Sequence, residues 1–216
     1  MTLQGTLMPP SRHVTLFHNP QSRSAGVRIL LEELNADYEL RVLDLKAGEN
    51  RKPDYLAINP MGKIPAIKHG DVLVTEQAAV YMYLAELYPE ARLSPAIGDP
   101  LRGPYLRWMV FYGSCFEPAL VDLSLKREPA PLGTSPYGDF ETVLGTVKKQ
   151  LSQGPWFLGE TFTAADILWG MALTWATGFK LVPELPEFKD YIARFNARPA
   201  VARARAKDAE LMAKQS

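Results

Sequence analysis

The sequence has 216 residues, 47% of them hydrophobic and 22% charged, and its 24 basic and 24 acidic side chains leave no formal net charge. This composition is that of an ordinary globular protein, and the length fits one large domain or two small ones. A neutral chain lacks the basic surface by which proteins attach to nucleic acid or to an anionic membrane, so we expect neither partner.

A single cysteine, Cys115, excludes an intrachain disulfide and a cysteine-rich metal site. No stretch of about 18 apolar residues occurs, so we expect no membrane-spanning helix. Residues 1–12 lack the charged start and long apolar stretch of a signal peptide, which predicts a short tail and a cytoplasmic protein. His18 and His69 have no partners at the spacing of metal ligands, so no metal is expected.

The first part of the chain alternates strand and helix patterns. Period-two alternation predicts strands, and apolar spacing of three and four predicts helices. The expected elements are a strand at 13–18, a helix at 25–34 closed by Asn35, a strand at 38–45, a short helix at 53–58, a hairpin of 63–68 with 72–75, and a helix at 76–88. This is the element order of a thioredoxin-like α/β domain, to which we assign residues 13–89.

After Pro89 the composition changes. Residues 90–101 are rich in proline, glycine and small side chains, which predicts a linker. No convincing strand follows, so we expect an all-helical domain over residues 102–216. Its expected helices are 105–125, 139–153, 163–179, 186–198 and 200–214.

Two segments resemble the cytosolic glutathione transferase family. NPMGKIPAI at 59–67, followed by VTEQAAVYMYLAELYP at 74–89, resembles the family's glutathione-binding signature. GETFTAADI at 159–167 resembles its helical-domain capping segment, in which Thr163 and Asp166 form a capping box. We assign that box a structural role. The resemblance covers residues 14–205 and implies the same two-domain fold.

The resemblance implies a glutathione site. In the family, the residue before a cis-proline pairs through its backbone with the cysteinyl unit, and this role falls on Ile64, before Pro65. Glu76 and Gln77 match the pair that holds the γ-glutamyl end, with glutamine where the family usually has serine. The helix N-terminus there favours a carboxylate. From the residues alone, Pro65 also fits an edge strand and Glu76 a helix cap.

Basic residues near this signature are candidates for the glycyl carboxylate. In several classes of the family a basic residue close to the short helix at 53–58 makes this contact. The candidates are Arg51, Lys52 and Lys63, although a solvated surface charge is the commoner fate of any one lysine.

The turn before the first helix is where the family stabilises the glutathione thiolate. A hydroxyl that donates to the sulfur lowers the thiol pKa. The candidates are Ser22 and Ser24, with Arg23 adding positive potential. We choose Ser22, because Ser24 also fits a helix N-cap. Gln21 falls where several classes have serine and Arg23 where the beta class has cysteine, so the turn resembles that of bacterial members with a Ser-Arg-Ser sequence.

Trp108, Tyr112 and Phe116 recur every four residues and share one face of the expected helix at 105–125. In the family this helix borders the site of the second substrate, so the three side chains are candidates for an apolar pocket. A core stripe or a dimer contact are the alternatives.

The resemblance implies an enzyme that activates glutathione as a thiolate and attacks a small hydrophobic electrophile. Glutathione is then the cosubstrate, no metal or organic cofactor is required, and a homodimer is expected. The alternative is a non-catalytic glutathione-binding or regulatory protein on the same fold, which the residues at Gln21 and Arg23 leave open. A dithiol oxidoreductase is discounted, because no cysteine occurs in the turn.

Overall fold

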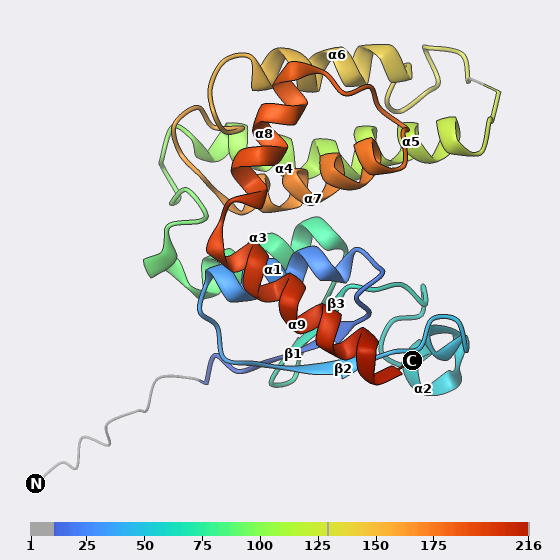
Figure 1. Ribbon diagram of the computed structural model, residues 1–216, viewed down its shortest axis with the longest axis vertical. Helices are drawn as coiled ribbons and strands as arrows, with labels where there is room; N and C mark the ends of the chain where they lie inside the picture. Colours follow the sequence, from blue (N-terminus) through green and yellow to red (C-terminus); the bar gives the residue numbers. More distant parts are fainter. Residues whose placement is uncertain (1–10, 129, 216) are drawn as a thin grey trace, which may run out of the picture.

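The computed structural model describes residues 11–128 and 130–215. Figure 1 shows a sheet-containing part below and a group of helices above, with the last helix, α9 (Pro199–Gln215), running back along the lower part. The predicted tail at residues 1–12 lies almost wholly outside the described residues.

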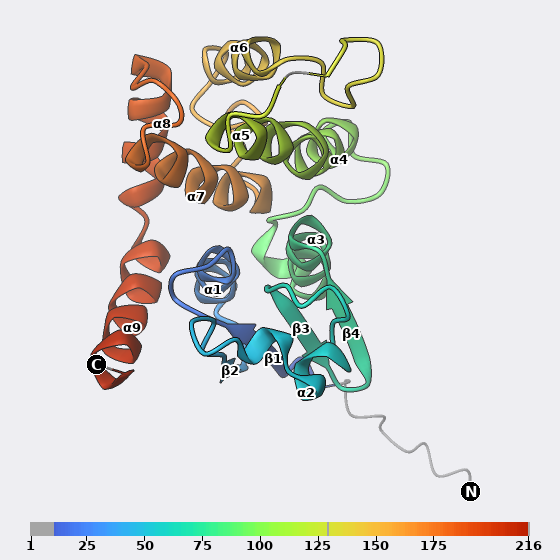
Figure 2. The same cartoon turned by 90° about the vertical axis from the view of Figure 1, so that its right-hand side faces the viewer.

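The sheet has four strands in the order β2-β1-β3-β4. Strand β1 pairs with β2 in parallel and with β3 antiparallel, and β3 pairs antiparallel with β4. Helices α1 and α3 cover one face and α2 lies on the other (Figure 2). The bounds are β1 Val14–His18, α1 Ser24–Glu33, β2 Tyr38–Val42, α2 Pro53–Leu56, β3 Ala66–His69, β4 Val72–Thr75 and α3 Gln77–Leu87. The predicted thioredoxin-like fold is confirmed.

The second half is helical, as predicted. Its helices before α9 are α4 Arg102–Phe111, α5 Glu117–Ser124, α6 Phe140–Leu151, α7 Ala164–Gly178 and α8 Pro186–Asn196. The single helix expected at 105–125 is divided by a π-helical turn, Tyr112–Phe116. Pro118, in the first turn of α5, has no N–H, so a regular α-helical ladder cannot pass through it. Within the described residues no helix is both long and apolar enough to cross a bilayer.

The predicted capping box at the start of α7 is present. The Thr163 N–H donates to Asp166 Oδ2 at 2.9 Å, and the Thr163 side chain caps the third residue of the helix in return. Asp166 also accepts from the Phe157 N–H at 2.8 Å and from the Tyr191 hydroxyl at 3.2 Å. The carboxylate therefore joins the start of α7 to the 156–162 loop and to α8.

Helix α9 packs along α1, so the end of the chain returns to the sheet domain (Figure 2). The contact is polar in part. Glu32 of α1 is 7% exposed and forms ion pairs with Lys207 and Arg203 of α9. Arg198, the residue before α9, pairs with Glu33 at the end of α1. Because these carboxylates are largely buried, α9 is packed firmly against the sheet domain.

Gly170 of α7 packs directly against Phe195 of α8. A Cβ at this position would lie 2.4 Å from the ring of Phe195, which is fully buried. We expect Gly170→Ala to lower the free energy of unfolding by about 1–3 kcal/mol through overpacking. Gly145, exposed on α6 with no atom within 4 Å of a Cβ, is the matched control. Gly145→Ala should raise the free energy of unfolding by up to about 1 kcal/mol.

Urea unfolding of both variants measures the contrast. Equal effects of the two alanines would show that helix propensity, and not the contact with Phe195, determines the outcome at Gly170.

Candidate functional site

Three segments meet at one edge of the sheet. Ala66, the first residue of β3, pairs with Phe17 of β1 on one side and with Thr75 of β4 on the other. Because both neighbours run antiparallel to β3, the residues before Ala66 lie beside those after Phe17 and Thr75. The register therefore brings together the turn after β1, the Ile64–Pro65 segment and the start of α3.

A cavity of about 590 Å³ opens at this edge, between the sheet domain and α5. We call it the polar cavity. Its volume is in the range of protein sites for small ligands. The residues predicted for the site that line it are Arg23, Lys63, Ile64, Pro65, Glu76 and Gln77. Its opposite wall includes Gly113 of the π-helical turn and Glu117 of α5.

The segment before β3 is held by two buried side chains. The Tyr55 hydroxyl donates to the Lys63 carbonyl at 2.6 Å, and Asn59 Nδ2 donates to the same oxygen at 2.8 Å. Burial raises the pKa of Tyr55 to about 12, so the phenol remains a donor at neutral pH. The Ile64–Pro65 peptide bond is cis. No described residue hydrogen-bonds to the Ile64 N–H or carbonyl, so both are available to an extended peptide.

Glu76 stands immediately before α3 in an unusual backbone conformation, with φ 66° and ψ 119°. Non-glycine residues rarely occupy this region, and such strain concentrates at functional sites. The Glu76 side chain makes no capping hydrogen bond to α3. Among the described residues, the buried Gln77 Oε1 also has no hydrogen-bond partner. This wall therefore offers the Glu76 carboxylate beside the N-terminus of a helix, with the buried Gln77 oxygen behind it.

The turn before α1 holds Ser22 and Ser24 at different depths. Ser22 is 9% exposed, and its hydroxyl donates to the Asn19 carbonyl at 2.8 Å. Ser24 is fully buried and is the first residue of α1 rather than the residue before it. Its Oγ accepts from the Asn19 N–H at 3.0 Å. Ser22 is the less buried of the two, and neither serine belongs to the described lining of the polar cavity.

Arg23, between these serines, reaches across to α5 and forms an ion pair with Glu117. Burial lowers the pKa of Arg23, but Glu117 and Tyr112 outweigh that effect and raise it above its usual value. The pair joins the first domain to the second at the wall of the polar cavity.

Two family models match the chain, the N-terminal domain of glutathione S-transferases over residues 12–86 and the C-terminal domain of the same family over residues 139–199. Glutathione S-transferase F10 of Arabidopsis thaliana is 31% identical over 165 residues, which cover 71% of this chain and 76% of that protein. The chain belongs to the glutathione S-transferase family.

Solved structures of this family share the fold. A glutathione transferase from Methylococcus capsulatus matches with a TM-score of 0.78 at 28% identity, over 91% of this chain and 98% of that one. A glutathione transferase homologue from Sulfitobacter, with bound glutathione, matches with a TM-score of 0.74 at 27% identity, over 91% and 98% of the two chains. The likeness therefore extends over both domains of the glutathione S-transferase fold.

The three basic residues considered for the carboxylate of glutathione lie in different places. Arg51 Nη1 donates to the Met61 carbonyl at 3.1 Å, and the Lys52 ammonium lies 3.9 Å from Glu49. Neither belongs to the described lining of the polar cavity. Lys63 does, and its side chain is exposed. The geometry favours Lys63 among the three.

A second cavity, of about 280 Å³, lies between α5 and α7, and we call it the apolar cavity. Tyr112 and Phe116 line it, and Arg23 and Glu117 line both cavities, so the two adjoin at that ion pair. Its other walls are mostly apolar: Leu120, Val121, Ser124, Ala172, Trp175, Ala176, Phe179 and Leu181. Burial raises the pKa of Tyr112, so its hydroxyl stays neutral.

Trp108 lies in the core instead, 1% exposed. Its ring packs edge-on against Trp169 at a centroid distance of 5.9 Å and against Phe157 at 4.8 Å. Trp169 in turn contacts Phe116 at 4.9 Å, so Trp108 supports the apolar cavity from behind.

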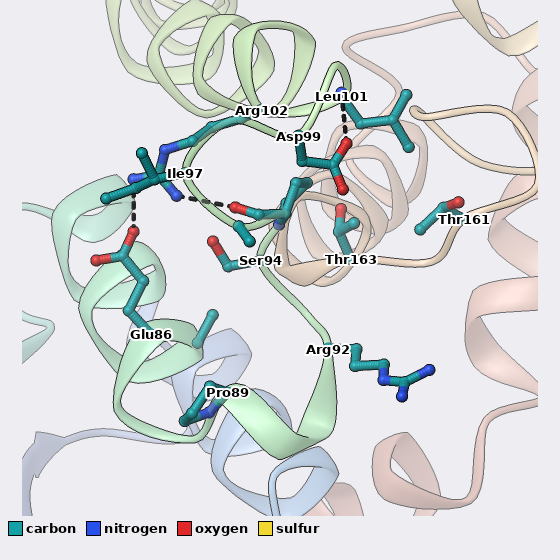
Figure 3. A pocket seen from close by; sticks show the side chains of 13 residues that line it. Glu86, Pro89, Arg92, Ser94, Ile97, Asp99, Leu101, Arg102, Thr161 and Thr163 are labelled. Atoms are coloured by element: carbon teal, nitrogen blue, oxygen red, sulfur yellow. Dashed lines mark hydrogen bonds and ion pairs between the residues drawn. The ribbon is translucent and has the colours of Figure 1, made fainter.

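A further hollow, of about 600 Å³, lies where the two halves of the chain join (Figure 3). Arg102 at the start of α4 donates to Glu86 of α3 at 2.9 Å and to the Pro95 carbonyl at 2.9 Å, and Figure 3 shows both contacts. No predicted site residue belongs to its described lining. These contacts fix the connection between the domains, and we assign the hollow no part in the chemistry.

Sequence reasoning missed Glu117, His18 and Asp208. His18 is fully buried at the end of β1, where the alternation of Val14 and Leu16 predicts an apolar side chain. A histidine in such a position is a detectable signal. Asp208, which contacts His18 at 2.9 Å, lies 190 residues later, and no local pattern connects the two.

Proposed function

We propose that this protein activates glutathione as a thiolate in the polar cavity and transfers the glutathionyl group to a small hydrophobic electrophile in the apolar cavity. The observation that supports this most is that the two cavities adjoin at the Arg23–Glu117 pair, one residue from Ser22. A sulfur held at that junction would face an apolar volume. The Sulfitobacter homologue, with bound glutathione, supports the same ligand.

The γ-glutamyl end of glutathione carries an ammonium and a carboxylate, and the start of α3 suits both. The Glu76 carboxylate accepts from the ammonium, and Gln77, which also lines the cavity, stands next to it. The free N–H groups and the dipole of α3 favour the carboxylate. The cysteinyl backbone pairs with Ile64, and Lys63 attracts the glycyl carboxylate.

Ser22 is proposed to donate to the thiolate. Ser22 is 9% exposed beside the N-terminus of α1, and its hydroxyl can exchange the Asn19 carbonyl for the sulfur by rotation about one bond. A hydrogen bond to the charged form and a nearby positive charge both lower a thiol pKa. Arg23 supplies that charge, offset in part by its pair with Glu117, and Ser24 is too deep to reach the sulfur.

The apolar cavity is proposed to take the electrophile, with Tyr112 and Phe116 against it. Its lining is dominated by apolar side chains from α5 and α7, so it selects a hydrophobic group.

We also propose a homodimer, as is usual in the family, and a division of the chain into domains at residues 90–101.

The direct test is an ultraviolet titration of the thiolate of bound glutathione against pH. We expect its midpoint to lie well below that of a free thiol, about 8.5. Binding without a lowered midpoint would support the alternative, a non-catalytic glutathione-binding or regulatory protein. An absence of binding would contradict the proposal altogether.

Glu76→Gln is expected to weaken glutathione binding about 10- to 100-fold, since a hydrogen bond to a charged group contributes about 1.5–3 kcal/mol. Calorimetry with glutathione and with an analogue lacking the γ-glutamyl ammonium forms a cycle. The analogue should bind the wild type and Glu76→Gln with similar affinity. If the substitution weakens both ligands equally, Glu76 does not contact the ammonium.

A further inference from the structure

An unbroken line of hydrogen bonds runs from the turn before α1 to α9. Ser22 Oγ lies 2.8 Å from Ser24 Oγ, which lies 2.9 Å from His18 Nδ1. His18 Nε2 lies 2.9 Å from Asp208 Oδ1. Ser24 and His18 are fully buried, whereas Ser22 is 9% and Asp208 7% exposed. The line therefore leads from the proposed thiol position into the interior.

The protonation of this line follows from its partners. Asp208 also accepts from Arg28 of α1, so it is a carboxylate and can only accept. Hence His18 Nε2 carries the hydrogen and donates to Asp208. In the neutral imidazole Nδ1 is then an acceptor, and Ser24 donates its hydroxyl hydrogen to it. The Ser22 hydroxyl has one hydrogen and two acceptors at 2.8 Å, the Asn19 carbonyl and Ser24 Oγ. When it turns from the carbonyl to Ser24, each hydroxyl in the line can pass its hydrogen one step toward His18.

We propose that Ser22, Ser24, His18 and Asp208 form a proton relay that carries the thiol proton of bound glutathione to His18 Nδ1, an inference that rests on the proposed function. The S–H bond breaks and its proton goes to Ser22 Oγ. The Ser22 proton passes to Ser24 Oγ, and the Ser24 proton passes to Nδ1. The products are a thiolate and an imidazolium, and no other reactant is needed.

The relay also reorients the hydroxyls. After the transfer His18 donates to Ser24, Ser24 donates to Ser22, and Ser22 donates to the sulfur. The thiolate thus acquires the donor that stabilises it in the same step in which it forms. When the thiolate has been consumed, the proton returns along the same hydroxyls to the leaving group or to water.

The charges around His18 are compatible with this transfer. Asp208 from α9 and Arg28 from α1 face it and cancel each other while the imidazole is neutral. After the transfer the cluster carries one positive charge, which attracts the thiolate. Glu32 pairs with Lys207, Arg203 and the hydroxyl of Tyr38 along the same α1–α9 contact. Tyr38 also interacts with Arg28, and Arg205 of α9 lines a small cavity together with Asp208. His18 and Asp208 do not touch glutathione and act as positioning residues through the two serines.

Imidazole nitrogen spectra test the relay directly. The chain has 3 histidines, so each isotope-labelled ring can be assigned by single substitution of His13 and His69. Without glutathione we expect His18 to be neutral with hydrogen on Nε2. With saturating glutathione, at a pH where the thiolate absorbance is present, both His18 nitrogens should carry hydrogen. A thiolate beside a neutral His18 would overturn the relay and leave the proposed function standing.

Asp208→Asn removes the charge that stabilises the imidazolium. We expect the pKa of the bound thiol to rise by about one unit. At pH values below this pKa, the fraction of thiolate then falls about tenfold. Binding of S-methylglutathione, which has no thiol proton, should be unchanged. Glu32→Gln is the matched control, because it removes another buried carboxylate at the same α1–α9 contact but outside the relay.

Glu32→Gln should lower the thermal midpoint to a similar extent and leave the thiol pKa at the wild-type value. If Asp208→Asn leaves the thiol pKa unchanged, or if Glu32→Gln raises it equally, the relay is wrong. If the wild-type protein does not bind S-methylglutathione, the proposed function itself is contradicted.

Discussion

Ser22→Ala is expected to lower kcat/KM for conjugation of glutathione to an activated aryl halide about 100- to 1,000-fold, the usual effect of losing one donor to a developing or bound anion. The alanine removes the hydroxyl that we propose donates to the thiolate, and no second hydroxyl of the turn is exposed. Ser24, the nearest other hydroxyl, is fully buried. The pKa of the bound thiol should rise accordingly in the ultraviolet titration.

Two controls separate this effect from a loss of structure. Ser152→Ala, at the end of α6, removes a hydroxyl that donates only to the nearby Lys149 carbonyl at 2.8 Å, and it should leave kcat/KM unchanged. S-methylglutathione should bind Ser22→Ala as it binds the wild type. An unchanged thiol pKa in Ser22→Ala would move the role to Arg23 or to a backbone N–H.

Asp166→Ala is expected to lower the free energy of unfolding by about 3 kcal/mol or more, because it leaves the buried Phe157 and Thr163 N–H groups without acceptors, each at a cost of about 1–3 kcal/mol. Asp166 is fully buried, so water cannot take its place. Urea unfolding measures the loss. Glutathione affinity of the folded fraction should be unaffected, since Asp166 lies outside the described lining of both cavities.

Asp139→Ala is the matched control, because this partly exposed aspartate also caps a helix, accepting from the Thr142 N–H at 2.7 Å. Its loss should matter much less, since water reaches the groups that it leaves. The pH dependence gives a second readout. Burial raises the pKa of Asp166 from 3.8 to about 6. The part of the stability that comes from this raised pKa is therefore fully present below about pH 4 and is lost as the pH rises through 6.

Relative to Asp166→Asn, which does not titrate, the wild type should lose stability between about pH 4 and pH 7. A gain over this interval would show that the hydrogen bonds to the ionised carboxylate outweigh its burial.

Local patterns predicted the parts of the fold that depend on neighbours in sequence. Asn35 closes α1 with φ 49°, as the tolerance of asparagine for the left-handed region predicts. The reciprocal bonds of Thr163 and Asp166 follow from a three-residue spacing alone. The division of the expected helix at 105–125 was missed, since a π-helical turn leaves no clear mark except Pro118.

The candidate site was predictable only where a contiguous motif describes it. Residues 59–67 and 76–77 bring their own turn, proline and helix start, so Ile64, Glu76 and Gln77 could be named. The burial of each side chain could not be predicted in the same way. Nothing local distinguishes the fully buried Ser24 from the less buried Ser22. In the same way, nothing local shows that Trp108 lies in the core while Phe116, two helical turns later, lines the apolar cavity.

By itself the sequence determined the two-domain fold, the order of the elements and the signature residues of the glutathione S-transferase family, because periodicity, capping and turn chemistry act over a few residues. Only the tertiary structure decided which side chains meet across long separations. The Arg23–Glu117 pair at the junction of the cavities and the line from Ser22 to Asp208 join elements 94 and about 190 residues apart. Such contacts depend on how β1, α1, α5 and α9 pack together, and packing is a property of the whole chain.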